Sequence, residues 1–104
     1  MKILNIKLID KYIKKKKDKD LSSSILNWIK TTKKSQWQTK EEIRDNYTKV
    51  SILPHSRVVF NISGNNYRLV VVVVIVAKTI RIEWIGDHKE YDRIDLTKRL
   101  IKIK

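Results

Sequence analysis

The sequence predicts an α+β fold in which N-terminal helices pack on a curved antiparallel β-sheet. In the first half, apolar residues recur every three or four positions among lysines, which is the period of amphipathic helices. After residue 50, β-branched residues dominate between turn-forming residues, which indicates consecutive strands. Helices followed by an antiparallel meander define the α+β class. A length of 104 residues suits one domain, spanning 1–104, with a single modest core.

The first helix is expected from residue 6 to about residue 17, with Ile6, Ile9 and Ile13 on its apolar face. It ends in a run of lysines, which suits the negative end of the helix dipole. The run is therefore interpreted as a solvated helix end or as a contact with a phosphate backbone, and the two readings are compatible. These candidate RNA-binding residues are Lys14, Lys15, Lys16 and Lys17.

Two more helices are expected before residue 50. The second starts near Asp20 or the serines at 22–24, any of which can cap it, and ends around residue 34. The third is short and follows Thr39, which forms a capping-box pattern with Glu42. Trp37, just ahead of this cap, is expected to act as a hydrophobic staple.

The second half predicts a meander of strands. The expected elements are strands at 57–62, 67–76 and 80–85, a turn at 63–66, a helical turn within 87–95, and a final strand or frayed tail at 96–104. The middle strand lacks polar alternation, so it is expected at the centre of the sheet, buried on both faces. The helices can cover one face only if the sheet curves strongly or a partner covers the other.

Charge and composition narrow the function. The formal net charge of +13 points to a polyanionic partner, with nucleic acid as the leading candidate. The absence of cysteine excludes disulfides, thiolate zinc sites and thiol nucleophiles, and the two histidines lack metal-ligand spacing, so we expect no metal and no cofactor. The longest apolar run, 69–77, is too short for a membrane helix. Charges interrupt the N-terminus before any signal-peptide core forms, so a cytoplasmic protein without membrane contact is expected.

Four residues in the second half fit metal-independent RNA cleavage. RNA carries its own nucleophile, the 2′-OH, so a nuclease needs a proton acceptor or donor and a cation at the phosphate. His88 is the candidate acid or base, oriented by Asp87 or Glu90. Arg57 and Arg68 stand near the two ends of the hairpin and are expected to lie close together and stabilise the phosphate.

The fourth candidate is Tyr91, three residues beyond His88, which would stack on a base or donate a proton. Lys89 is a further candidate for phosphate contact, and His55, in the loop after Pro54, is a candidate RNA contact. Each residue also has a structural reading. The histidines suit an exposed surface, the arginines suit ion pairs, and Tyr91 suits packing on the sheet.

A series of positions in this half resembles a known family. They are the block Arg57-Val-Val-Phe-Asn-Ile62, then Gly64-Asn65 and Tyr67-Arg-Leu-Val70, with Gly86, His88, Glu90, Tyr91, Asp92, Ile94 and Asp95. Ser35-Gln-Trp37 and Lys40-Glu-Glu-Ile-Arg44 with Tyr47 extend the likeness, which covers roughly residues 25–95. The chain resembles the HigB-type toxins of bacterial type II toxin–antitoxin systems, within the RelE-like superfamily.

The resemblance implies a RelE-like domain that acts as an mRNA interferase, an endoribonuclease that cuts messenger RNA on the ribosome. It also implies a HigA-type helix-turn-helix antitoxin as partner. The chain departs from the family at Asp87, where the family usually has Thr, and at Val74-Ile75, where a polar or aromatic pair is common. The alternative function is a non-catalytic basic module that binds RNA or a partner with the same fold.

Overall fold

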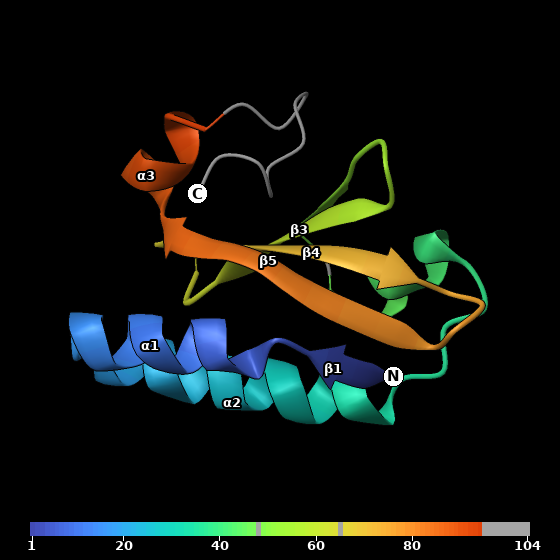
Figure 1. Cartoon of the computed structure of the whole chain (residues 1–104), viewed down its shortest axis with the longest axis horizontal. Coiled ribbons are helices and arrows are strands. Elements are labelled where there is room, and N and C mark those ends of the chain that lie inside the picture. Colours follow the sequence, from blue (N-terminus) through green and yellow to red (C-terminus); the bar gives the residue numbers. More distant parts are fainter. Residues whose placement is uncertain (48, 65, 95–104) are drawn as a thin grey trace.

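The computed structural model describes residues 1–47, 49–64 and 66–94, and within them a five-stranded sheet carries two long helices on one face (Figure 1). The strands are β1 (Lys2–Leu4), β2 (Val50–Ile52), β3 (Arg57–Ile62), β4 (Tyr67–Val74) and β5 (Thr79–Asp87). The helices are α1 (Ile6–Lys16), α2 (Lys19–Lys34), the 3-10 helix η1 (Lys40–Asp45) and the short α3 (His88–Asp92). The predicted α+β class is confirmed.

The sheet has the order β1-β5-β4-β3-β2 and is mixed rather than wholly antiparallel. The predicted meander is present, since β3, β4 and β5 pair antiparallel and β4 lies at the centre. The sequence did not reveal β1, which adds to β5 in parallel, or β2, which pairs antiparallel with β3. Both are three residues long, which is too short for an alternating pattern to identify them.

The β3–β4 hairpin follows the predicted turn chemistry. Ser63 and Gly64 adopt left-handed backbone angles, with φ of 54° and 68°. The turn also closes by a hydrogen bond from the backbone N–H of Asn66 to the carbonyl of Ser63. β4 ends at Val74, two residues earlier than predicted. Asn65 and the predicted strand or tail at 96–104 lie outside the described residues.

Helices α1 and α2 bury their apolar sides against one face of the sheet. Ile9, Leu21, Ile25 and Trp28 lie in one core cluster with the inward residues of all five strands. α2 begins earlier than predicted because Asp18, and not Asp20 or a serine, is its N-cap. The Asp18 carboxylate accepts hydrogen bonds from the backbone N–H groups of Asp20 and Leu21.

The predicted capping box at the third helix does not form. η1 is a 3-10 helix whose N-cap, Thr39, makes no side-chain capping bond, while Glu42 accepts from the backbone N–H of Gln38 at 3.2 Å. Trp37 is buried, as a staple residue would be, and its indole N–H donates to Asn46 Oδ1 at 2.8 Å.

The opposite face of the sheet, which we call the second face, is not covered by α1 or α2 (Figure 1). Because side chains alternate along a strand, it receives Arg57, Val59 and Asn61 from β3 and Arg68 and Val70 from β4. A small apolar cluster lies there, formed by Val59 and Val70 with Leu53, Trp84, Tyr91 and Ile94. No helix among the described residues is long and apolar enough to cross a membrane.

Candidate functional site

The candidate site lies at one end of the second face, where β5 leads directly into α3. Strand register aligns Asn61 of β3, Arg68 of β4 and Gly86 of β5 in one row across the sheet. Gly86 is required by packing, because a Cβ there would lie 2.4 and 2.6 Å from ring atoms of Trp84. The glycine thus allows the Trp84 indole to lie close to the backbone at the start of α3.

Arg68 and Tyr91 are brought together at this end. The Arg68 guanidinium carbon lies 5.8 Å from the centre of the Tyr91 ring, and the Tyr91 and Trp84 rings are 6.1 Å apart. Burial raises the pKa of the Tyr91 hydroxyl, so the phenol stays protonated at neutral pH. A cation and a protonated phenol therefore share one place on the sheet.

His88 and Lys89 lie in the first turn of α3, both exposed. The backbone N–H of His88 donates to the carbonyl of Asn66 at 3.1 Å, which joins the start of α3 to the β3–β4 turn. His88 precedes Tyr91 by three positions, the spacing that places two side chains on one side of a helix. The imidazole is thus presented at the same end of the sheet as Arg68.

A capping box that sequence reasoning missed fixes α3. The Asp87 carboxylate accepts from the backbone N–H of Glu90 at 2.8 Å, and Glu90 Oε1 accepts from the backbone N–H of Asp87 at 2.8 Å. This hydrogen bond to Glu90, and then the nearby Lys16 ammonium, lower the pKa of Asp87. Asp87 therefore serves as the N-cap of α3, a role that a Thr at this position could also fill. The Asp-x-x-Glu spacing in the sequence was the pattern that could have predicted this capping box.

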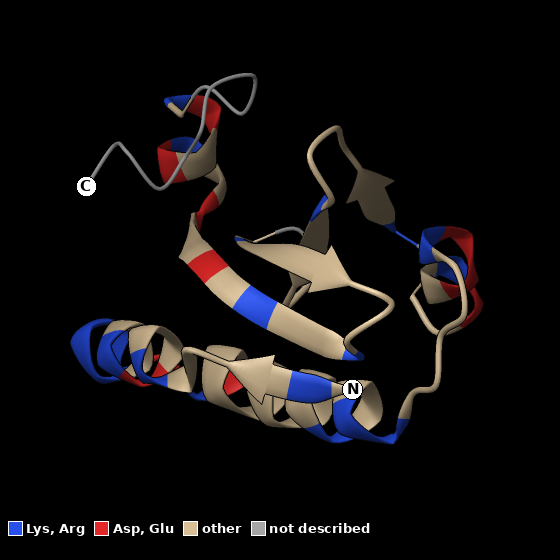
Figure 2. Ribbon diagram, turned by 45° about the vertical axis from the view of Figure 1, so that its right-hand side comes forward, with Lys and Arg blue, Asp and Glu red and all other residues tan. Residues whose placement is uncertain are grey.

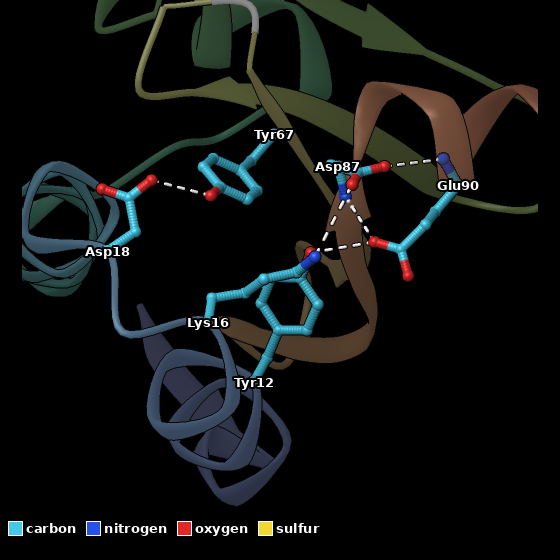
Figure 3. A network of polar contacts seen from close by, with 6 residues as sticks. All are labelled: Tyr12, Lys16, Asp18, Tyr67, Asp87 and Glu90. Carbon is cyan, nitrogen blue, oxygen red and sulfur yellow. Dashed lines mark hydrogen bonds and ion pairs between the residues drawn. The ribbon is translucent and has the colours of Figure 1, made fainter.

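A polar network anchors α3 to the rest of the fold (Figure 3). The Tyr12 hydroxyl of α1 donates to Glu90 Oε1 at 2.9 Å, and Lys16 Nζ lies 3.6 Å from Asp87 Oδ2. Burial and the bond to Glu90 raise the pKa of Tyr12. Both carboxylates are thus engaged in holding α3.

A second hydrogen bond of this network joins β4 to the start of α2. The Tyr67 hydroxyl donates to Asp18 Oδ2 at 2.7 Å, and its ring meets that of Tyr12 edge-on, with centres 6.1 Å apart. This bond raises the pKa of Tyr67 to about 12 and lowers the pKa of Asp18. The α1–α2 junction, β4 and α3 therefore form one connected unit.

The predicted lysine run occupies the end of α1 beside this network. Lys14, Lys15 and Lys17 are exposed, whereas Lys16 is half-buried between Asp87 and the Tyr12 ring. In Figure 2, Lys and Arg positions gather at both ends of the helical layer, and few charged positions lie along the sheet. Three of the four lysines remain accessible to a phosphate backbone, and the fourth serves α3.

Arg57 lies elsewhere on the second face, contrary to the expectation that it would approach Arg68. Its Cα partner in β4 is Val72, four residues from Arg68, which corresponds to about 13 Å along the strand. The Arg57 side chain is 3% exposed, and its Nε lies 3.0 Å from Oε1 of the equally buried Glu83. His55 is exposed in the loop at this same distant end.

A β-bulge in β5 makes the Arg57 ion pair possible. Val70 pairs with Trp84 while Val71 pairs with Ile82, so Glu83 is an extra residue in β5. As a result, Glu83 and Trp84 both serve the second face. Glu83 also binds Arg81, at 2.9 Å from Nη2 to Oε2. The structure thus separates Arg57 and His55 from the group at α3.

A family model described as HigB_toxin, the RelE-like toxic component of a toxin-antitoxin system, matches residues 21–94. The match covers well over half of the chain and includes most of α2 together with η1, β2 to β5 and α3. No curated protein matches the chain significantly.

Proposed function

Because the chain belongs to the HigB family, the RelE-like toxic components of toxin–antitoxin systems, we propose that it is an endoribonuclease that cuts messenger RNA on the ribosome. The observation that carries this proposal is the contact of Arg68 with Tyr91 at one end of the second face, with His88 three positions before Tyr91 in α3, in a strongly basic protein. The arrangement offers a cation for the phosphate and two groups able to move protons.

In the proposed reaction, the 2′-OH of the RNA attacks the adjacent phosphorus atom and the P–O5′ bond breaks, giving a 2′,3′-cyclic phosphate and a free 5′-hydroxyl. His88 takes the 2′-OH proton as general base. Tyr91 gives a proton to the leaving 5′-oxygen as general acid. Arg68 neutralises the charge that develops on the phosphate.

The remaining charged residues receive supporting roles in this proposal. Lys89 and the exposed Lys14, Lys15 and Lys17 contact phosphates of messenger and ribosomal RNA. Arg57 is left out of the substrate contacts because its guanidinium is buried against Glu83. His55, at the distant end of the sheet, is also left out. The proposed chemistry uses no metal and no cofactor.

The family implies an antitoxin partner, and we propose that it is of the HigA type and blocks the toxin in the cytoplasm. The test is induction of the chain in growing bacteria with and without the antitoxin. Growth should stop with the chain alone and resume with the antitoxin. His88→Ala should relieve the arrest, whereas His55→Ala, a matched change at the other histidine, should not. Equal arrest by the His88 variant would remove His88 from the mechanism.

A further inference from the structure

Two adjoining cavities lie beside β3 at the same end of the sheet as Arg68. One has a volume of about 300 Å³ and the other about 210 Å³, and Tyr47 and Asn61 line both. The larger cavity is lined by Asn46, Tyr47, Lys49, Phe60, Asn61 and Gly64. The smaller one adds the polar side chains of Ser24, Asn27 and Ser63. Nothing in the proposed reaction uses these cavities.

The Tyr47 ring, which lines both cavities, is held rigidly in place. The Tyr47 ring packs edge-on against Phe60, with centres 4.9 Å apart. Its hydroxyl is held on the inside, 3.1 Å from the carbonyl of Trp28 and 2.9 Å from Thr32 Oγ. Because the hydroxyl is occupied there, Tyr47 offers the cavities its ring surface. Such a fixed ring suits a flat heteroaromatic ligand.

The polar groups around this ring have the donors and acceptors that a nucleobase edge requires. Asn46 is oriented by Trp37, whose indole N–H can only donate, so Asn46 accepts through Oδ1 and its NH₂ group points away from that bond. Asn61 also lines both cavities, and Asn27 lines the smaller one. Amide side chains are well suited to base edges, because they donate and accept side by side.

The position relative to Arg68 links the cavities to RNA. Asn61 and Arg68 are Cα partners in neighbouring strands, which places their backbones about 5 Å apart. Lys49, exposed at the larger cavity, adds a positive charge for the sugar-phosphate chain. Because α2 residues line the smaller cavity and Arg68 lies on the second face, a strand whose phosphate lies at Arg68 would pass around β3 at Asn61 to place a neighbouring base in the cavities.

We propose that the two cavities form a recognition site for the base next to the cleaved phosphate and so set the sequence preference of the toxin. This inference rests on the proposed function for its substrate, which is single-stranded RNA. The polar lining favours a base over an apolar side chain of a protein partner.

The test measures binding rather than cleavage, so it can fail or succeed independently of nuclease activity. Four single-stranded tetranucleotides, one for each base, carry 2′-O-methyl groups that block cutting. Each is titrated into the full chain while the indole and side-chain amide signals are followed by NMR. We expect one base to bind about tenfold more tightly than the weakest and to shift the signals of Trp28 and Asn46.

The decisive variant is Asn46→Asp, which keeps the acceptor for Trp37 but removes the NH₂ donors. This variant should bind the preferred tetranucleotide about tenfold more weakly. Gln38→Glu makes the same chemical change at an exposed position outside both cavities and should leave binding unchanged. Equal binding of all four bases, or an Asn46 variant that keeps the preference, would overturn the proposal. So would cavity signals that respond to purified antitoxin and to none of the tetranucleotides.

Discussion

The buried ion pair between Arg57 and Glu83 makes the sharpest prediction about stability. Each of these side chains is at most 3% exposed, and Glu83 is the carboxylate that both Arg57 and Arg81 contact. Replacing Glu83 with Gln removes its charge but keeps an oxygen near Arg57. The buried Arg57 guanidinium then loses the charge of Glu83, and removing one partner is the costly way to break a buried ion pair.

Breaking a buried pair from one side costs about 3–5 kcal/mol. We place Glu83→Gln near the lower limit, at about 3 kcal/mol, because the glutamine oxygen still accepts a hydrogen bond. For a domain of this size, that loss lowers the midpoint of thermal unfolding by about 15 °C. Arg81 is the matched comparison, since its side chain is 46% exposed. Its replacement by Gln should cost less than about 1 kcal/mol.

The assay is thermal unfolding at pH 7, followed by circular dichroism, of the native chain and these two variants. A third variant, with Arg57 and Glu83 both changed to Met, should recover most of the loss because neither charge of this buried pair remains. If Glu83→Gln unfolds within a few degrees of the native chain, Arg57 does not depend on Glu83. In that case the structural role given to Arg57 is wrong.

Three further predictions concern the site and its anchors. Gly86→Ala places a methyl group against the Trp84 ring and should cost about 1–3 kcal/mol, measured by urea unfolding; an unchanged midpoint would contradict the packing. The lowered pKa of Asp18 adds stability that is fully present above about pH 3.9 and is lost as pH falls through its folded-state pKa. Tyr67→Phe removes the hydrogen bond that lowers the pKa of Asp18 most, so the unfolding free energy of this variant should fall less between pH 5 and pH 2 than that of the native chain. An equal fall in both proteins would contradict this role of the bond. Lys89→Gln should reduce the slope of log affinity for RNA against log salt by about 1, and an identical slope would exclude a phosphate contact.

Much of the fold followed from local patterns in the sequence. The apolar spacing of α1 and the unbroken β-branched run of β4 each extend over enough residues for their period to be recognised. The edge strands β1 and β2 were not predicted because each is too short to show a period. β1 is defined by parallel pairing with Thr79–Arg81, a contact far away in sequence that three residues cannot specify.

The site was predictable only in part. Arg68 lies beside Tyr91, and His88 lies at the same end of the sheet, because β5 leads directly into α3 beside β4. The distance of Arg57 from Arg68 along the sheet could have been predicted by counting back from the turn. Pairing of Ile62 with Tyr67 requires pairing of Arg57 with Val72. The burial of Arg57 could not be predicted from the sequence, because it depends on the bulge in β5 that brings Glu83 to the same face.

The capping box at α3 shows how a local pattern needs its surroundings to be weighed. Thr39 with Glu42 and Asp87 with Glu90 have the same spacing, yet only the second pair forms both reciprocal bonds. At the first, Glu42 accepts from Gln38 instead. Tertiary contacts from Tyr12 and Lys16 accompany the second box, and no sequence pattern linked those residues to α3.

Mapping the new 5′ ends of transcripts after induction tests directly whether this toxin cuts messenger RNA with Arg68 and Tyr91 at the phosphate. We expect cuts within translated frames that disappear when the start codon of the message is removed. Arg68→Gln and Tyr91→Phe should abolish most cuts while the proteins stay folded. Growth arrest without new 5′ ends, or unchanged cutting by both variants, would contradict the account.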